Sequence, residues 1–227
     1  MLFLVLGRGK TGSIVAQVAS ERGHGVRVLG EEENPSASAL NAPFLAGFDA
    51  VIDFTTPDAV IPNLRACLAN GARVVVGTTG WYAHLSDMRA LAERKGAGLL
   101  YGTNFSIGVQ AMLRVARELA VAVPDYKFSI TETHHVSKKD APSGTALTIK
   151  QVLQTANPAL EVEITSKREG DASGIHVIEA RSQNDVIELK HEAFSRRGFA
   201  EGAVRAAEWI AGKTGVWEFS EIAGKLS

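Results

Sequence analysis

The stretch that decides the fold is Leu2-Phe3-Leu4-Val5-Leu6-Gly7-Arg8-Gly9-Lys10-Thr11-Gly12. Its five apolar residues predict a buried strand, and its three glycines predict a tight turn. The apolar residues Ile14, Val15 and Val18 then follow at helical spacing, which predicts a helix over residues 13–20. A strand, a glycine turn and a helix in this order are typical of a Rossmann-like, doubly wound α/β domain.

The glycines of this turn match the dinucleotide-binding pattern G-x-G-x-x-G. In that pattern Gly7 permits the tight turn, Gly9 lets a pyrophosphate approach the backbone, and Gly12 allows the helix to pack closely on the strand. An ordinary structural turn is the alternative interpretation. The residues predicted to contact the coenzyme here are Gly7, Arg8, Gly9, Lys10, Thr11 and Gly12.

The choice between NADH and NADPH depends on the residues that follow the second strand, predicted over 26–29. Glu31 and Glu32 follow it, and an acidic side chain there favours NADH because it accepts hydrogen bonds from the ribose. Arg8 and Lys10 could instead pair with a 2′-phosphate, so both coenzymes stay open, with NADH favoured. A solvated loop explains the two glutamates equally simply.

Strands and helices continue to alternate as far as residue 104. Strands are predicted over 50–54, 73–76 and 98–101, and helices over 58–69 and 82–95, which indicates a parallel sheet covered on both faces. Two strands end in small residues at the carboxyl edge, where such sheets bind ligands and where a nicotinamide ring would have room. These residues, which plain turns would also explain, are Gly77, Thr78, Thr79, Gly102, Thr103, Asn104 and Phe105.

Beyond residue 104 the pattern changes. A helix is predicted over 107–120, and strands over 127–133, 162–166, 175–180 and 185–191, with one helix among them and a last helix over 199–210. Consecutive strands without crossover helices indicate a smaller α+β domain with a mixed sheet. We therefore expect a dinucleotide-binding domain over 1–104, a substrate-binding and oligomerisation domain over 105–193, and a segment over 194–227 that packs back on the first domain.

The composition of the chain limits its function classes. With 24 basic and 25 acidic residues its net charge is -1, so nothing global attracts nucleic acid or an anionic membrane. No apolar stretch approaches the ~20 residues of a membrane span, and Cys67, the single cysteine, lies in an apolar-periodic stretch that predicts a buried thiol. These features favour a cytoplasmic enzyme or binding protein.

The segment from Glu132 to Thr145 holds the residues best suited to chemistry. It contains two histidines, which can transfer protons near neutral pH, and two lysines, which supply positive charge. Ser143 is a good helix N-cap, so the amides near Gly144 and Thr145 are placed to bind a carboxylate. The segment therefore predicts a pocket for a small dianion, and a capped helix after a basic surface loop is the alternative.

A metal site is a competing interpretation of the same segment. Glu132 and His134 share a strand face, and His135 or Asp140 could add a ligand. The two neighbouring lysines would repel a cation, and no cysteine lies nearby. We therefore expect no metal here.

The run from Glu132 to Ala146 also fits E-x-H-H-x-x-K-x-D-A-P-S-G-T-A, and on it the chain resembles the 4-hydroxy-tetrahydrodipicolinate reductase (dihydrodipicolinate reductase) family. Further matches lie at residues 7–12, 77–80, 104–108, 191–196 and 199–203, so the resemblance covers nearly the whole chain. It implies NAD(P)H-dependent reduction of a small dicarboxylate imine, 4-hydroxy-tetrahydrodipicolinate, to tetrahydrodipicolinate in lysine and diaminopimelate biosynthesis.

The resemblance also implies roles for single residues. His134 would be the catalytic acid/base and Lys138 the proton donor, and the substrate contacts would be His135, Ser143, Gly144 and Thr145. The family builds a homotetramer through its second sheet, and the passage 175–185 is shorter here than is usual in the family.

Three further interpretations concern the chain as a whole and two of its other histidines. One alternative function is another two-domain NAD(P)-dependent amino-acid or imino-acid dehydrogenase, and a second is a non-catalytic NADH-binding redox sensor. His176 and His191 fall in predicted strands and are interpreted as structural histidines.

Overall fold

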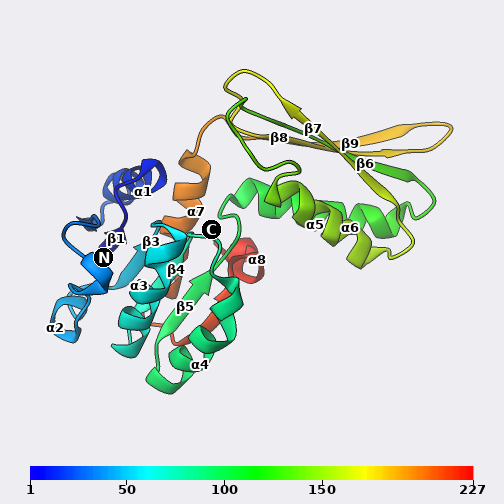
Figure 1. The fold of residues 1–227 in the computed structure, drawn as a ribbon. Helices are drawn as coiled ribbons and strands as arrows, with labels where there is room; N and C mark the ends of the chain where they lie inside the picture. Colours follow the sequence, from blue (N-terminus) through cyan, green and yellow to red (C-terminus); the bar gives the residue numbers. More distant parts are fainter. Residues whose placement is uncertain (227) are drawn as a thin grey trace. The chain divides into compact units, whose positions relative to one another are not determined.

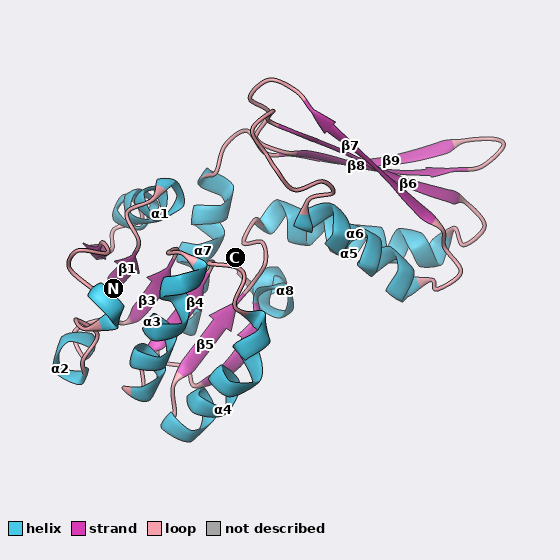
Figure 2. Ribbon diagram, viewed as in Figure 1, coloured by secondary structure: helices cyan, strands magenta, loops and turns pink. Residues whose placement is uncertain are grey.

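The computed structural model describes residues 1–226, which form two compact units (Figures 1 and 2). Unit 1 contains residues 1–107 and resumes at Arg197, and unit 2 is Gly108–Arg196. The domain boundaries expected from the sequence were 104/105 and 193/194, a few residues before each of these transitions. No helix within residues 1–226 is both long enough and apolar enough to span a membrane.

Unit 1 is built on a six-stranded sheet of order β10-β5-β4-β3-β1-β2, in which every pairing is parallel. Its strands are β1 (Leu2–Leu6), β2 (Gly25–Leu29), β3 (Ala50–Asp53), β4 (Arg73–Val76), β5 (Gly98–Tyr101) and β10 (Gly215–Glu218). The predicted doubly wound parallel sheet is therefore confirmed.

Helices cover both faces of this sheet. They are α1 (Lys10–Glu21), α2 (Ala42–Leu45), α3 (Pro57–Ala69), α4 (Leu85–Lys95), α7 (Arg197–Ile210) and α8 (Phe219–Ile222), with short 3-10 turns at Pro35–Ala37, Tyr82–His84 and Ala223–Lys225. Phe3 and Val5 of β1 belong to one core, and Leu4 belongs to the other. Because neighbouring residues of a strand point to opposite faces, a strand buried on both sides is apolar throughout, as the sequence of β1 shows.

Helix α3 contributes Cys67 to the second core. The thiol is fully buried, as the sequence predicted, and burial raises the pKa of Cys67 well above its ordinary value.

The direction of strand order reverses at β1, which lies between β2 and β3. In open α/β sheets the crevice for a ligand forms at such a reversal, beyond the carboxyl ends of the two strands involved. Here those ends are Gly7 after β1 and Phe54 after β3. The glycine turn is therefore at the position in the sheet where a dinucleotide binds.

The C-terminal strand β10 pairs with β5 in parallel. The sequence did not predict this strand, because only two of its four residues, Val216 and Trp217, are apolar, which is too few for a hydrophobic pattern to be recognised. It is followed by α8, whose Phe219 is fully buried in the same core as Phe3.

Unit 2 contains a four-stranded sheet of order β7-β6-β8-β9. Its elements are α5 (Ile107–Ala122), β6 (Lys127–His134), α6 (Gly144–Ala156), β7 (Val162–Arg168), β8 (Ile175–Arg181) and β9 (Val186–Glu192). Strands β6 and β7 are parallel, with α6 as their crossover helix, while β8 is antiparallel to both of its neighbours. The predicted mixed sheet is confirmed, and in Figure 1 both helices of the unit lie along one face of it.

Candidate functional site

The three glycines of the turn after β1 are there for different physical reasons. Gly7 has a φ of +102°, and a Cβ on it would lie 2.3 Å from the carbonyl oxygen of Phe54. A Cβ on Gly12 would lie 2.1 Å from the carbonyl oxygen of Gly7, so the turn and the helix can meet only if this residue is glycine. Gly9 has an ordinary φ of -70°, and nothing lies within 4 Å of a Cβ there. Folding therefore explains Gly7 and Gly12 but leaves Gly9 unexplained.

Gly9 is also the N-cap of α1, and within residues 1–226 no side chain caps that helix end. The positive end of a helix dipole and its first N–H groups bind anions well. Open space beside Gly9 and an uncapped helix start fit the pyrophosphate of a dinucleotide. Arg8 and Lys10 flank Gly9, and both are exposed.

The acidic residue that reaches this turn from the end of β2 is Glu33. Its carboxylate accepts a hydrogen bond of 2.7 Å from the N–H of Gly30 and forms an ion pair with Arg8. The hydrogen bond from Gly30, helped by Arg8, holds the pKa of Glu33 below its ordinary value. Glu31, the acidic residue that the sequence pointed to, is exposed in the turn that follows Gly30, and its contact with the coenzyme stays a prediction.

The carboxyl ends of β3 and β4 are held together by a buried carboxylate, Asp53. It accepts hydrogen bonds from the amide and hydroxyl of Thr55, from the hydroxyl of Thr78 at 2.8 Å, and from Asn63. Burial raises the pKa of Asp53, although these hydrogen bonds oppose the rise. No pattern in the sequence marked Asp53 as an organiser of this edge. Thr78, which was predicted to contact the coenzyme, directs its hydroxyl at Asp53.

Two further predicted contacts from this part of the chain lie beside Thr78. A Cβ on Gly77 would come within 2.1 Å of the ring of Phe54, so close packing alone requires glycine. Thr79 is exposed at the same edge.

The residues after β5 divide into core and edge. Phe105 is 2% exposed and its ring centroid lies 4.5 Å from that of Phe219, so its side chain belongs to the core. A Cβ on Gly102 would lie 2.8 Å from Cβ of Phe219. Thr103 is exposed, and Asn104 accepts a hydrogen bond of 2.9 Å from the N–H of Ser106. Of the residues predicted here, Thr103 and Asn104 have the more accessible side chains.

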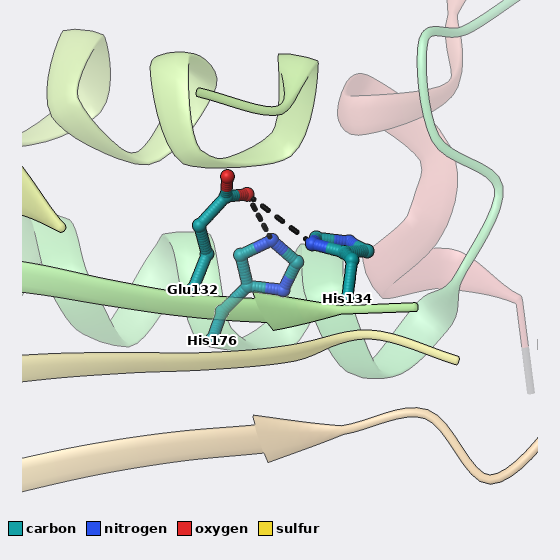
Figure 3. A group of neighbouring side chains, drawn as sticks. All are labelled: Glu132, His134 and His176. Atoms are coloured by element: carbon teal, nitrogen blue, oxygen red, sulfur yellow. Dashed lines mark ion pairs between the residues drawn. The ribbon is translucent and has the colours of Figure 1, made fainter. Parts of the chain in front are cut away.

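In unit 2 the side chains of Glu132, His134 and His176 converge (Figure 3). Glu132 and His134 are two residues apart on β6 and so share a face, and His176 is the direct partner of Glu132 on β8. Atom Oε2 of Glu132 lies 3.4 Å from Nδ1 of His134 and 3.8 Å from Nε2 of His176. The two rings meet edge to face with centroids 5.2 Å apart.

Glu132 is fully buried and is bonded from several elements. Its Oε1 accepts hydrogen bonds from the hydroxyl of Ser166 at 2.8 Å, from Arg168 at 3.2 Å and from the N–H of Ser143 at 3.0 Å. Burial disfavours the charged form, but these hydrogen bonds outweigh it and hold the pKa of Glu132 below its ordinary value. The cluster therefore contains a buried carboxylate that is ionised at neutral pH.

The two imidazoles of the cluster are both biased towards the neutral form. Burial lowers the pKa of His134, with Glu132 opposing the shift and Lys138 adding to it. Burial and the neighbouring His134 lower the pKa of His176 to about 4. A Cβ on Gly174 would lie 3.1 Å from Nε2 of His134, so a side chain at position 174 would push against this ring.

The loop between β6 and α6 places the other predicted residues. Lys138 is bound to the carboxylate of Asp140 at 2.7 and 2.8 Å, and Nδ1 of His135 lies 2.8 Å from the hydroxyl of Ser137. Arg168 of β7 donates to the backbone oxygen of Asp140 at 2.5 Å and so holds the loop to the sheet. Neither Lys138 nor His135 is hydrogen-bonded to the Glu132 cluster.

Helix α6 begins as the sequence predicted. The hydroxyl of Ser143 caps it by accepting a hydrogen bond of 3.2 Å from the N–H of Ala146, and lies 3.3 Å from Nε2 of His176. Nothing lies within 4 Å of a Cβ on Gly144, and Thr145 is partly exposed beside it. The structure thus joins Ser143 to the Glu132 cluster and leaves open space at the first residue of the helix.

Several members of this cluster could not be predicted from the sequence. Ser166 and Arg168 carried no signal in the sequence, and His176 was interpreted as a structural histidine. Only the register between β6, β7 and β8 brings these residues to Glu132.

Comparison with known proteins accounts for both units. A family model described as the N-terminus of dihydrodipicolinate reductase matches residues 2–105, and one described as its C-terminus matches residues 108–222. The chain belongs to the dihydrodipicolinate reductase family. The 4-hydroxy-tetrahydrodipicolinate reductase of Christiangramia forsetii is 32% identical to it over 100% of this chain and 99% of that protein. The enzyme of the same name from Natronomonas pharaonis is 38% identical to it over 92% of this chain and 94% of that protein.

A solved structure of the family agrees with these sequence matches. The dipicolinate-bound dihydrodipicolinate reductase from Paenisporosarcina sp. TG-14 has a TM-score of 0.78 and 25% identity to this chain, covering 98% of it and 99% of that protein. The resemblance drawn from residues 132–146 is confirmed. Members of the dihydrodipicolinate reductase family use NADH or NADPH, which agrees with the dinucleotide-binding architecture of unit 1.

Proposed function

We propose that this chain reduces 4-hydroxy-tetrahydrodipicolinate to tetrahydrodipicolinate with NADH or NADPH, within lysine and diaminopimelate biosynthesis. The observation that carries the proposal is the pairing, within unit 2, of a buried proton-transfer residue, His134, with an open helix start at Gly144. Reduction of a dicarboxylate imine requires a proton donor such as His134, and binding of its carboxylates requires anion-binding groups such as the N–H groups at this helix start.

The residues of unit 2 bind the substrate and move a proton. The N–H groups at the start of α6, near Gly144 and Thr145, hold a carboxylate of the substrate. One charge pair at 4 Å contributes on the order of 4 kcal/mol at an effective dielectric of about 20, so two such contacts fix a small dianion. His134 is the acid/base, and Arg168 and the ionised Glu132 hold its surroundings in place.

Lys138 is the second proton donor in the proposal. Asp140 holds its ammonium group in the structure, so Lys138 must exchange this partner for the substrate before it can act. The imidazole of His135 is hydrogen-bonded to the hydroxyl of Ser137, so it can rotate towards the substrate only when that bond breaks. We therefore assign the main proton transfer to His134.

The residues of unit 1 bind the coenzyme, which supplies a hydride to the substrate when bound. Gly9 and the first amides of α1 hold the pyrophosphate. Glu33 accepts hydrogen bonds from the ribose hydroxyls of NADH, and Arg8 is the partner for the 2′-phosphate of NADPH. Because Arg8 and Glu33 are paired with each other, neither coenzyme is excluded, and NADH is slightly favoured.

A homo-oligomer belongs to the same proposal, with a tetramer as its expected size. The sheet of unit 2 has helices on one face, and exposed apolar side chains such as Val186 and Ile187 lie on its edge strand β9. Light scattering coupled to size-exclusion chromatography measures this directly, and a monomer would contradict it. A cytoplasmic location and the absence of a nucleic-acid partner stay predictions.

The activity is tested by following NADH absorbance with enzymatically generated 4-hydroxy-tetrahydrodipicolinate, and then with NADPH. We expect both coenzymes to be oxidised only when the substrate is present. His134→Gln should lower kcat far more than it raises the Kd of NADH, because proton delivery is needed in the transition state. Binding of NADH without turnover in the unmodified protein would refute the enzyme assignment and favour a redox sensor.

A further inference from the structure

The three side chains of the Glu132 cluster have the spacing of a metal site. Ligand atoms around a tetrahedral zinc ion, at bond lengths of about 2.1 Å, lie about 3.4 Å apart. Oε2 of Glu132 is 3.4 Å from Nδ1 of His134 and 3.8 Å from Nε2 of His176. All the ligand atoms of the cluster lie within 4.8 Å of one another, so small rotations of the imidazoles close the triangle. Figure 3 shows both rings directed at the same carboxylate oxygen.

The two oxygens of Glu132 have different partners. Ser166 and Arg168 bond only to Oε1, and the N–H of Ser143 lies nearer to Oε1 at 3.0 Å than to Oε2 at 3.2 Å. Both imidazoles face Oε2. A cation can therefore bind Oε2 while Oε1 keeps the bonds that anchor the carboxylate, an arrangement in which outer partners orient a metal ligand.

A second observation also points to a ligand. The side chain of His134 is 10% exposed, and its Nδ1 is buried with no hydrogen-bond partner among residues 1–226. Buried ring nitrogens nearly always have a hydrogen-bond partner. Nδ1 of His134 has none, although it faces a carboxylate and a second imidazole, and this needs an explanation. Coordination of a cation supplies it.

The positive charges nearby do not exclude a cation. Lys138 is neutralised by the carboxylate of Asp140 at 2.7 Å, and Lys139 is exposed. Arg168 is the remaining close cation, and its bonds run to Oε1 of Glu132 and to the backbone oxygens of Asp140 and Lys167. In the folded chain the pairing of Lys138 with Asp140 therefore weakens the repulsion of a metal that the sequence suggested.

We propose that Glu132, His134 and His176 form a binding site for a divalent transition-metal ion of the zinc class, and that the bound ion inhibits the enzyme. Two imidazoles and one carboxylate are ligands that zinc prefers, and a fourth position stays open to water. The ion would coordinate Nδ1 of His134 and hold its ring in the cluster, so the proposed acid/base could no longer serve the substrate. The proposed metal site does not depend on the proposed function, whereas the proposed inhibition does.

Cobalt titration tests the site with a readout that does not depend on activity. Co²⁺ alone is added to the full chain, and the visible ligand-field bands of tetrahedral cobalt are recorded until they saturate; Zn²⁺ should then displace them. We expect one ion per chain, because among residues 1–226 no other group of three or more His, Cys, Asp or Glu side chains brings its ligand atoms this close. The absence of a saturable cobalt spectrum would overturn the proposal.

Two variants separate this cluster from its neighbour in sequence. His176→Gln should weaken Co²⁺ binding at least ~100-fold, because loss of a direct ligand costs more than the 10–100-fold loss of an outer partner. His135→Gln removes a histidine adjacent to the cluster and should bind Co²⁺ as the unmodified chain does. Equal binding by His176→Gln, or loss of binding in His135→Gln, would contradict the assignment.

Two measurements on the unmodified chain complete the test if His176→Gln fails to fold. X-ray absorption of the zinc complex should show two imidazole ligands and oxygen neighbours, and a spectrum with fewer than two imidazoles refutes the site. In the reductase assay Zn²⁺ should inhibit turnover, and excess chelator should restore it. Binding without inhibition would refute the inhibitory role alone, and the proposed activity is judged separately from the metal-free rate.

Discussion

The contrast between Gly9 and Gly12 gives the sharpest test of the coenzyme turn. The two residues lie three positions apart, yet a Cβ on Gly9 meets nothing within 4 Å while a Cβ on Gly12 lies 2.1 Å from a backbone oxygen of Gly7. Gly9→Ala should therefore leave folding intact and damage binding. Gly12→Ala should damage folding first.

The sizes of the two effects follow from these contacts. Gly9 has a φ that alanine adopts without strain, so its variant should stay within about 0.5 kcal/mol of the unmodified chain. A methyl group where the pyrophosphate approaches should weaken NADH binding on the order of 100-fold, or about 2.7 kcal/mol. Overpacking at Gly12 should cost about 2–3 kcal/mol, since the atom it meets belongs to the backbone and cannot rotate away.

Thermal unfolding with and without NADH measures both quantities. NADH at 100 times its Kd stabilises the unmodified chain by about 2.7 kcal/mol. At the same NADH concentration the stabilisation falls to about 0.4 kcal/mol if the Kd rises 100-fold. Gly9→Ala should thus keep its Tm without NADH and lose most of the shift, whereas Gly12→Ala should unfold roughly 5–10 °C lower.

A third substitution is the matched control for this pair. Gly198 of α7 also has nothing within 4 Å of a Cβ, and Gly198→Ala should change neither the Tm nor the NADH shift appreciably. If Gly9→Ala gives the full NADH-dependent shift, the turn does not hold the pyrophosphate, and the reasoning from open space at Gly9 is wrong.

Three other predictions test further parts of the chain. Glu33→Gln removes the charge paired with Arg8 and should raise the NADPH to NADH ratio of kcat/KM about tenfold, whereas an unchanged ratio would mean that Glu33 does not contact the ribose. Gly144→Ala places a methyl group in open space and should raise the KM for substrate about tenfold with no loss of Tm; an unaltered KM would move the carboxylate site elsewhere. Cys67, whose thiol is buried and has a raised pKa, should react with a thiol reagent only on unfolding in urea, and stoichiometric labelling of the native protein would contradict its place in the core.

Much of the parallel sheet could be predicted because its central strands are short and mostly apolar. The strands β1, β4 and β5 have the bounds read from the sequence, since burial on both faces makes them almost entirely apolar. The strand β10 could not be predicted, because Gly215–Glu218 contains only two apolar residues and its pairing with β5 joins distant parts of the chain. Its existence depends on tertiary contacts rather than on local pattern.

The candidate coenzyme site also depends on a loop conformation that the sequence pattern does not predict. The glycine pattern located the turn, because Gly7 and Gly12 meet local steric demands of the fold and Gly9 keeps open space at the start of α1. The acidic residue was predicted at Glu31, which stays a prediction, and the structure adds Glu33, whose carboxylate contacts Gly30 and Arg8 of the turn. The contacts of Glu33 come from the chain folding back after Gly30, a loop conformation that neither composition nor periodicity encodes.

The cluster in unit 2 was predicted where it is local in sequence and missed where it is not. His134 and the N-cap Ser143 come from one segment, whose turn and capping signals are readable. His176 joins them only through the antiparallel register of β6 and β8, and Arg168 only through the parallel register of β6 and β7. A one-residue shift in either register would turn those side chains to the other face of the sheet.

Glu132 explains why the residues of this segment belong together. Its buried carboxylate bonds to the N–H of Ser143, eleven residues along the chain, and so fixes where α6 begins relative to β6. Arg168 and Ser166 bond to the same oxygen and bring β7 into register with that helix start. His134 lies two residues beyond Glu132 on the same strand face. One carboxylate therefore sets the position of the anion-binding helix end relative to the proton-transfer residue, and a loss of charge there should disturb both at once.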